Sequence, residues 1–156
     1  MIWIVCGAGS GVGKTHLSFR LCDVLPDSAY AKLGHHSPQK GKPENYFTSR
    51  EEILKFIDDN ADRGNLVLES NSLAKSGIAD LAVFIDEIPG RTDVRDDRVE
   101  LMNISDIIIS ASGRSGNWKN VLEKKVKDPG LINLLLEIFS DHEDYIKSGA
   151  REERQV

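Results

Sequence analysis

The chain has 156 residues, a net charge of −5 and an isoelectric point near 5.4. This length suits one domain with a substantial core, and the acidic balance argues against a general nucleic-acid binder, whose surface is basic. No apolar run approaches the roughly 20 residues of a membrane-spanning helix, and two cysteines make no disulfide framework. We therefore expect a cytoplasmic protein with reduced thiols, and with neither nucleic acid nor a membrane as partner.

The chain begins with a predicted strand, a glycine-rich loop and a predicted helix. Residues 2–6 are an unbroken apolar run, as in a strand buried on both faces, and they lack the features of a secretory signal. After the loop, Leu17, Leu21 and Val24 recur at helical spacing until Pro26 interrupts the pattern. This order of elements is the context that a phosphate-binding loop requires.

The loop fits the P-loop pattern G-x-x-x-x-G-K-[ST], with alanine at the first position. Glycines let successive backbone N–H groups face one point, where they bind phosphate oxygens together with the N-terminus of the next helix. Lys14 would contact the outer phosphates, and the Thr15 hydroxyl would bind Mg²⁺. The alternative is a glycine turn that binds no ligand. We disfavour it because a buried lysine between Gly13 and Thr15 would have no packing role. The predicted nucleotide-binding residues are Ala8, Gly9, Ser10, Gly11, Val12, Gly13, Lys14, Thr15 and His16.

The next segment predicts a strand, a long loop and a helix. Residues 28–33 read as the second strand, and the prolines and glycine of residues 37–48 predict a loop long enough to be functional. Ser49 and Glu52 have the spacing of a capping box, which begins a helix that ends near Gly64.

The middle of the chain predicts three more strands. Residues 66–69 and 81–86 are apolar runs that each end in a carboxylate, and residues 107–109 form the last clear strand. We expect a loop over residues 71–77 and a short helix around residues 94–102.

The C-terminal part predicts two helices. The first covers residues 118–126, and the second begins at Asp128, a capping residue followed by proline at the first helical position. Residues 131–139 are apolar almost all round, which predicts burial in the core or against a partner. Beyond them, from Asp141 on, the chain is charged and predicts a frayed helix or a disordered segment. The predicted organisation is one domain over residues 1–140 and a charged tail over residues 141–156.

Short apolar strands that alternate with helices predict an α/β protein. With the loop described above, this is a three-layer P-loop NTPase fold, with a mostly parallel sheet and helices on both faces. Ligands of such sheets bind beyond the carboxyl ends of the strands. Besides the P-loop, polar residues follow four strands, namely His35, His36, Glu69, Asp86 and Ser110. We expect the fold to gather them at one edge of the sheet.

Several segments of the first half resemble one family of P-loop proteins. The P-loop opens the chain at its first strand, and the second strand ends in Lys32-Leu33-Gly34-His35-His36. Gly41-Lys42-Pro43-Glu44-Asn45-Tyr46 is similar to a Gly-Lys-acid-Ser-Tyr stretch, and Val67-Leu68-Glu69 to a strand ending in Val-Glu-Gly. Together they resemble the proteins related to molybdopterin-guanine dinucleotide biosynthesis protein B, the MobB family.

The resemblance implies binding and slow hydrolysis of GTP or ATP with Mg²⁺, and an accessory role in molybdenum cofactor biosynthesis. It also implies a homodimer, and molybdopterin or an enzyme of that pathway as partner. Lys32, His35 and His36 would then bind the second substrate. The chain departs from the family at Ser70, where the family has glycine. It also lacks the acidic residue behind the histidines, and a guanine motif after Ile109.

Glu69 and Asp86 compete for the second magnesium position. A carboxylate just past a buried strand, facing the P-loop threonine, can hold Mg²⁺ through water. We favour Glu69, which the resemblance places on the strand next to the P-loop, while Asp86-Glu87 resembles the strand end of ATPases whose glutamate activates water. The catalytic candidates are Lys14, Glu69 and Asp86, and the candidate metal ligands are Thr15 and Glu69. One of the two residues is better interpreted as an exposed carboxylate at a strand end, without a role in metal binding.

Other functions of the same loop stay open. A small-molecule kinase, or a ligase in the manner of dethiobiotin synthetase, would use the loop over residues 37–48 as a lid. A nickel-insertion GTPase would pass metal through His35 and His36, although two histidines alone are a weak metal signal. Arg91 and Arg114 are candidates for an arginine finger, although exposed arginines are common on any surface.

Overall fold

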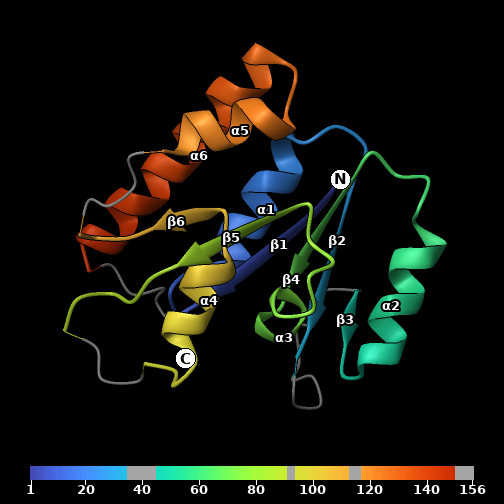
Figure 1. Cartoon of the computed structure of the whole chain (residues 1–156), viewed down its shortest axis with the longest axis horizontal. Coiled ribbons are helices and arrows are strands. Elements are labelled where there is room, and N and C mark those ends of the chain that lie inside the picture. Colours follow the sequence, from blue (N-terminus) through green and yellow to red (C-terminus); the bar gives the residue numbers. More distant parts are fainter. Residues whose placement is uncertain (35–44, 91–93, 113–116, 150–156) are drawn as a thin grey trace.

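The computed structural model describes residues 1–34, 45–90, 94–112 and 117–149. In these ranges a six-stranded sheet lies between layers of helices (Figure 1). The elements in chain order are β1 (Ile2–Gly7), α1 (Lys14–Val24), β2 (Ser28–Leu33), β3 (Tyr46–Phe47), α2 (Arg50–Asp59), β4 (Asn65–Glu69), α3 (Asn71–Ala74), β5 (Leu81–Ile85), α4 (Arg98–Ile104), β6 (Ile107–Ile109), α5 (Trp118–Lys125) and α6 (Pro129–Lys147).

The strand order positions the site. All strand pairs among the described residues are parallel, in the order β3-β2-β4-β1-β5-β6. Parallel neighbours need crossover connections, which explains why strands and helices alternate. Because β1 lies between β4 and β5, the loops that follow these strands are neighbours at one edge. The predicted α/β fold, with a parallel sheet and helices on both faces, is confirmed.

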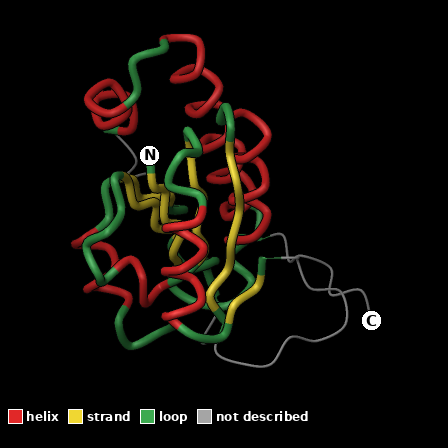
Figure 2. The backbone as a smooth tube through the Cα atoms, turned by 90° about the vertical axis from the view of Figure 1, so that its right-hand side faces the viewer, coloured by secondary structure: helices red, strands yellow, loops and turns green. Residues whose placement is uncertain are grey.

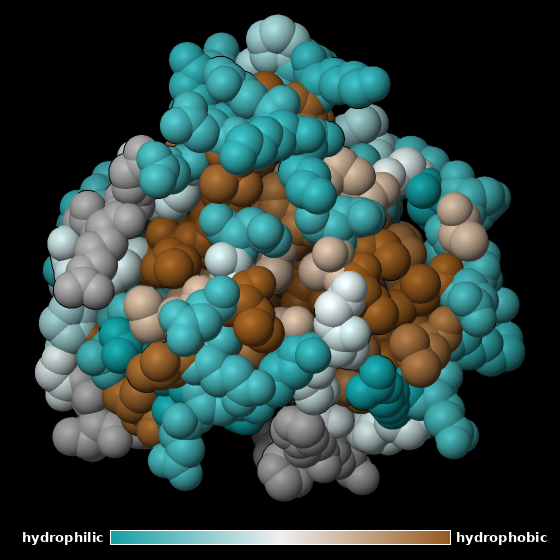
Figure 3. Space-filling view, in the orientation of Figure 1, coloured by the Kyte–Doolittle hydropathy of each residue, from teal (hydrophilic) through white to brown (hydrophobic). Residues whose placement is uncertain are grey.

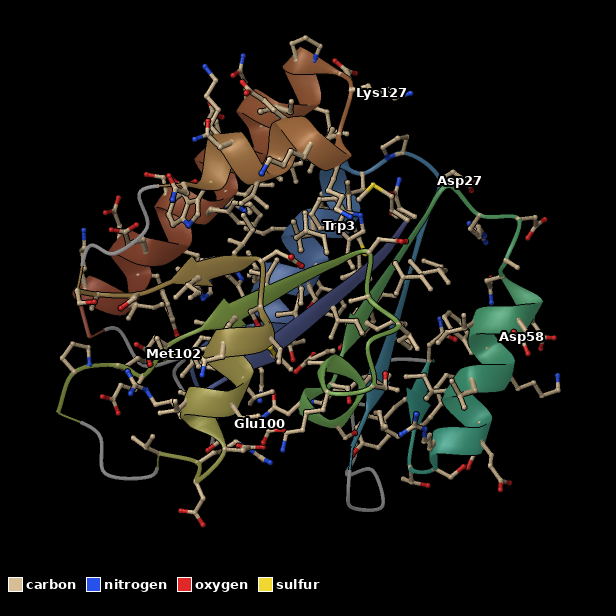
Figure 4. All side chains as sticks on the ribbon, in the orientation of Figure 1. Trp3, Asp27, Asp58, Glu100, Met102 and Lys127 are labelled. Carbon is tan, nitrogen blue, oxygen red and sulfur yellow. The ribbon has the colours of Figure 1, made fainter. Side chains whose placement is uncertain are left out.

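Helices cover both faces of the sheet (Figure 2). Each face has its own hydrophobic core. Trp3 and Val5 of β1 belong to the core shared with α1, α5 and α6. Ile4 and Cys6 of the same strand belong to the core under α2, α3 and α4. Alternate residues enter opposite cores because successive strand side chains point to opposite faces. Trp3, labelled in Figure 4, is fully buried, and its indole N–H donates to Asn65 Oδ1 at 3.1 Å.

The outer surface is hydrophilic around its rim, with hydrophobic residues gathered toward the middle of the face seen in Figure 3. None of the described helices combines the length and apolar character needed to cross a bilayer.

Two helix starts form as their sequences predict. The Ser49 hydroxyl accepts from the Glu52 N–H at 3.2 Å and donates to the Glu52 carboxylate at 2.9 Å. Asp128 Oδ1 accepts from the Gly130 N–H at 2.9 Å, at the start of α6. These bonds satisfy donors that the first turn of a helix leaves without a partner.

The end of α6 differs from the sequence prediction. Residues 141–147 are neither a frayed helix nor disordered, because the packed helix α6 continues through Lys147. His142 and Ile146 are buried one helical turn apart, at 3% and 0% exposure, while the charged Asp141 and Asp144 face solvent. Apart from Glu143, which is buried and pairs with Lys147, the charge that predicted a tail belongs to the outer face of an amphipathic helix. Further up α6, Leu135 and Phe139 are buried within the core of this chain.

Other local predictions also needed correction. The expected loop after Glu69 begins with the short helix α3, whose start is capped where Ser70 Oγ accepts from the Leu73 N–H at 3.1 Å. Within the expected loop over residues 37–48, β3 pairs with β2. The helix expected around residues 94–102 starts later, at Arg98, and ends at Ile104. Elements as short as α3 and β3 escape pattern analysis because each spans only about one period of a helix or a strand.

Candidate active site

The loop between β1 and α1 has left-handed backbone at two glycines. Gly11 has φ 76° and Gly13 has φ 88°, values that side-chain-bearing residues rarely adopt. Gly13 is also the residue that caps α1, so the helix begins directly at Lys14. The Ala8 N–H donates to the Ile85 carbonyl at 2.9 Å, which ties the loop to the end of β5. The N-terminus of α1 is thus presented at the carboxyl edge of the sheet, the geometry used to bind phosphate.

His142 supports this loop from the side of α6. Its Nε2 lies 2.9 Å from the Val12 carbonyl oxygen, and since a carbonyl only accepts, Nε2 carries the proton. A Cβ on Gly13 would lie 2.6 Å from His142 Cε1, so the ring occupies the space a side chain would need. Burial lowers the pKa of His142, against the opposing effect of the bond to Val12. His16 stacks on the outer side of this ring, with centroids 6.2 Å apart.

Asn71 holds the other end of the loop. Its Oδ1 accepts from the Gly7 N–H at 2.9 Å, and its Nδ2 donates to the Gly7 carbonyl at 3.1 Å. A Cβ on Gly7 would lie 2.8 Å from Val12 Cγ2, so the chain is closely packed here. No motif identified Asn71 in the sequence, and the one available signal was its place just after the buried strand that ends at Glu69.

Replacing Asn71 with alanine should lower the free energy of unfolding by about 2–4 kcal/mol, because it leaves a buried N–H and a buried carbonyl of Gly7 without partners. Chemical denaturation measures this loss. Asn60→Ala is the matched control: the Asn60 amide donates to the Phe56 carbonyl at a half-exposed helix end, and its loss should cost below about 1 kcal/mol. Equal losses in the two variants would contradict the role given to Asn71.

Glu69 is the centre of a buried polar cluster. It is 2% exposed, and its carboxylate accepts from the Thr15 hydroxyl at 2.8 and 3.0 Å and from the Tyr30 hydroxyl at 2.7 Å. The Lys32 ammonium lies 3.2 Å from Oε1. Burial raises the pKa of Tyr30, and the nearby Glu69 charge raises it further. Burial lowers the pKa of Lys14, an effect that Glu69 opposes.

The Thr15 and Glu69 oxygens fit a magnesium ion by their chemistry. Mg²⁺ prefers hard oxygen ligands, keeps several waters, and is usually held by one or two protein groups together with substrate phosphates. The structure places a hydroxyl and a carboxylate in direct contact at the start of α1. These two side chains would hold the ion beside the phosphates.

Asp86 has a different environment. Its two oxygens accept from Arg98 Nε at 2.7 Å and from Arg98 Nη2 at 2.8 Å, a two-pronged pair. The Glu87 N–H donates at 2.8 Å, and the Ser110 hydroxyl approaches at 3.4 Å. Burial alone would raise the pKa of Asp86, but the hydrogen bonds from Arg98 and Glu87 outweigh it and the pKa is lowered. Of the two candidate carboxylates, it is Glu69 that contacts Thr15.

Two cavities lie along the carboxyl edge. One of about 140 Å³ is lined by Lys14, Lys32, Leu33, Gly34, Glu69, Ser70, Asn71 and Arg95. The other, of about 730 Å³, lies between the ends of β5 and β6 and the helix α4, whose Met102 is labelled in Figure 4. Its polar lining includes Asp86, Arg98, Ser110 and Ser112.

Some predicted site residues lie outside the described residues. These are His35 and His36 of the second-substrate and nickel hypotheses, and the candidate arginine fingers Arg91 and Arg114. Within the described ranges, no group of three or more His, Cys, Asp or Glu side chains is arranged to hold a metal. Lys32 is described, and it binds Glu69 at the rim of the smaller cavity.

Comparisons with known proteins give a distant structural likeness. No protein-family model matches the chain, and a search of curated proteins finds no match. Among the solved structures, an unliganded sugar kinase from Janibacter sp. HTCC2649 is 17% identical, with a TM-score of 0.35 over 97% of this chain and 98% of that one. A TM-score this low decides nothing about function, and the resemblance to the MobB family gains no support from these searches. The fold and the site define an α/β protein whose P-loop joins β1 to α1.

Proposed function

We propose that the protein binds a nucleoside triphosphate with Mg²⁺ at the P-loop and transfers the terminal phosphoryl group, slowly to water when it acts alone. The observation that carries this proposal is the contact between the Thr15 hydroxyl and the buried Glu69 carboxylate, beside Lys14. A glycine turn without a ligand would not need a buried carboxylate and a partly desolvated lysine at its opening.

Each residue has a distinct role in this function. Loop N–H groups and the N-terminus of α1 bind the phosphates, and Lys14 contacts the outermost ones. Thr15 and Glu69 would hold Mg²⁺, which when bound neutralises charge on the phosphates. The Lys32 ammonium, 3.2 Å from Glu69, balances the carboxylate in the absence of the cation. A cation at Glu69 would weaken that pair and leave Lys32 available to an anionic acceptor in the smaller cavity.

A calorimetric titration tests the proposal. The purified protein is titrated with non-hydrolysable analogues of ATP and of GTP, each with and without Mg²⁺. We expect one analogue to bind, and to bind more tightly with the ion, because Thr15 and Glu69 are both oxygen ligands. The stronger analogue identifies the base. Heat of binding from neither analogue in either condition would refute the proposal.

The accessory role in molybdenum cofactor biosynthesis is a narrower form of this proposal. It rests on the resemblance of residues 1–70 to the MobB family and on Lys32, which places positive charge at the smaller cavity. We expect a His35→Ala, His36→Ala double variant to keep its nucleotide affinity and lose binding of molybdopterin. Loss of nucleotide binding instead would assign the two histidines to the nucleotide site. The homodimer that the family implies is tested by light scattering.

A small-molecule kinase is the second candidate, favoured by the cavity of about 730 Å³. This volume is in the range that holds small ligands, and Glu87 lines both this cavity and a narrow space under Ala8 and Ser10 of the P-loop. If the protein is an accessory nucleotidase, adding small alcohols or amines should not change its rate of nucleotide hydrolysis. If it is a kinase, adding its acceptor should raise the rate of nucleotide turnover and give a phosphorylated product.

A further inference from the structure

Arg95 is attached to the P-loop through its backbone. It lies in the segment between β5 and α4, and no sequence motif singles it out. Its N–H donates to the Ala8 carbonyl at 2.7 Å, and Ala8 is fully buried. The position of the Arg95 backbone is therefore fixed relative to the first residue of the loop.

Arg95 lies beside the cavity that would receive the terminal phosphate. It lines the cavity of about 140 Å³ together with Lys14 and Glu69. Arg95 also affects the pKa of Lys14. Burial is the main cause of the lowered pKa of Lys14, and the positive charges of Lys32 and Arg95 lower it further. Three cations thus surround one carboxylate here, an excess of positive charge that suits a phosphoryl group.

The Arg95 guanidinium now rests on Asp97. Nε donates to Oδ1 at 2.9 Å and Nη2 donates to Oδ2 at 3.3 Å. Asp97 also binds the Lys75 ammonium at 2.6 Å, and these partners, Arg95 first, hold the pKa of Asp97 at about 2. The Arg95 side chain is 42% exposed and that of Asp97 is 15% exposed, so water reaches the guanidinium side of the pair. If Arg95 leaves, Lys75 still balances the Asp97 carboxylate.

We propose that Arg95 is a built-in arginine finger, which moves from Asp97 to the terminal phosphoryl group during transfer. This inference rests on the proposed function. In hydrolysis the bond from the γ-phosphorus to the β–γ bridging oxygen breaks, and its electron pair stays on the nucleoside diphosphate. A bond from a water oxygen to the γ-phosphorus forms, and the proton of that water passes to the released phosphate. Arg95 stays protonated and donates to the equatorial oxygens, where charge accumulates.

The test compares Arg95→Ala with a matched control, Arg63→Ala, which removes an exposed arginine paired with Asp27 at 3.4 Å, away from the loop. Single-turnover hydrolysis should slow about 10³-fold in Arg95→Ala, while affinity for the non-hydrolysable analogue changes less than about threefold. Binding of the nucleoside diphosphate with Mg²⁺ and aluminium fluoride, which imitates the phosphoryl group in transfer, should be lost. Arg63→Ala should match the wild type in all three measurements.

Arg95→Lys separates charge from geometry. It keeps the positive charge but loses the planar fork, so it should regain a small part of the rate only. Melting temperatures confirm that each variant is folded.

The outcomes distinguish this inference from the proposed function. If the wild type does not bind the triphosphate analogue, the proposed function fails, and the inference fails with it. If the wild type binds and Arg95→Ala hydrolyses and traps aluminium fluoride as the wild type does, only the inference is overturned. A fall in analogue affinity as large as the fall in rate would also overturn it, because Arg95 would then bind the ground state.

Discussion

Lys14→Met should weaken binding of the triphosphate by about 100-fold, with the fold intact. The substitution replaces an ammonium by an apolar side chain of similar length, so it removes charged hydrogen bonds to the outer phosphates, worth about 1.5–3 kcal/mol. Stability should not fall, because burial already disfavours the charged form of Lys14 and Glu69 keeps Lys32 as partner. Isothermal titration calorimetry and thermal unfolding measure the two effects.

Lys55→Met is the matched control. Lys55 is exposed and pairs with Asp59 one turn along α2, so its loss removes the same charge from the protein without touching the loop. Its affinity for nucleotide should equal that of the wild type. Equal affinity in Lys14→Met and Lys55→Met would mean that the nucleotide binds elsewhere, or that the loop binds phosphate without the lysine.

Glu69→Gln should weaken the binding of the magnesium ion on which turnover depends. The amide keeps the shape of the side chain and an oxygen that accepts from Thr15 or Tyr30, but it removes the charge that attracts the ion. Groups that hold a metal through water typically contribute 10- to 100-fold in metal affinity or activity. We therefore expect the Mg²⁺ concentration for half-maximal turnover to rise by about that factor, measured by titrating the ion at saturating nucleotide.

Asp86→Asn provides the comparison. It leaves the Arg98 guanidinium without its ionic partner, so it should lower the melting temperature while the magnesium requirement stays that of the wild type. If Asp86→Asn raises the Mg²⁺ concentration for half-maximal turnover and Glu69→Gln does not, the assignment of the two carboxylates is reversed.

The sequence predicts those parts of the site that depend on a short contiguous motif or on apolar runs that recur along the chain. The P-loop is contiguous, and the apolar runs that become β1, β4 and β5 can be recognised one by one. Once β1 and β4 are parallel neighbours, Glu69 at the end of β4 lies near Thr15, which follows β1. Asp86 has the same sequence context, and nothing in that context shows that its partner is an arginine twelve residues later.

The supporting residues could not be predicted because their partners are distant backbone groups. Asn71 binds Gly7 across 64 residues, and His142 contacts Val12 across 130. A bond to a backbone carbonyl or N–H places no demand on the identity of the partner residue, so no paired pattern appears in the sequence. Arg95 is attached to Ala8 in the same way. The charged residues around His142 indicated a tail because the two buried positions, His142 and Ile146, lie only one helical turn apart. One turn is too short to show a helical period in the sequence.

The contact of His142 with Val12 links the order of synthesis to the order of assembly. Translation delivers the P-loop before α6, yet the ring that packs behind Val12 and Gly13 comes from the last turns of α6. A nascent chain can form β1 and α1 early, but its phosphate cradle lacks one wall until residues 142–146 have left the ribosome. We therefore expect nucleotide to bind once α6 has been synthesised, and not to bind a nascent chain that still lacks α6.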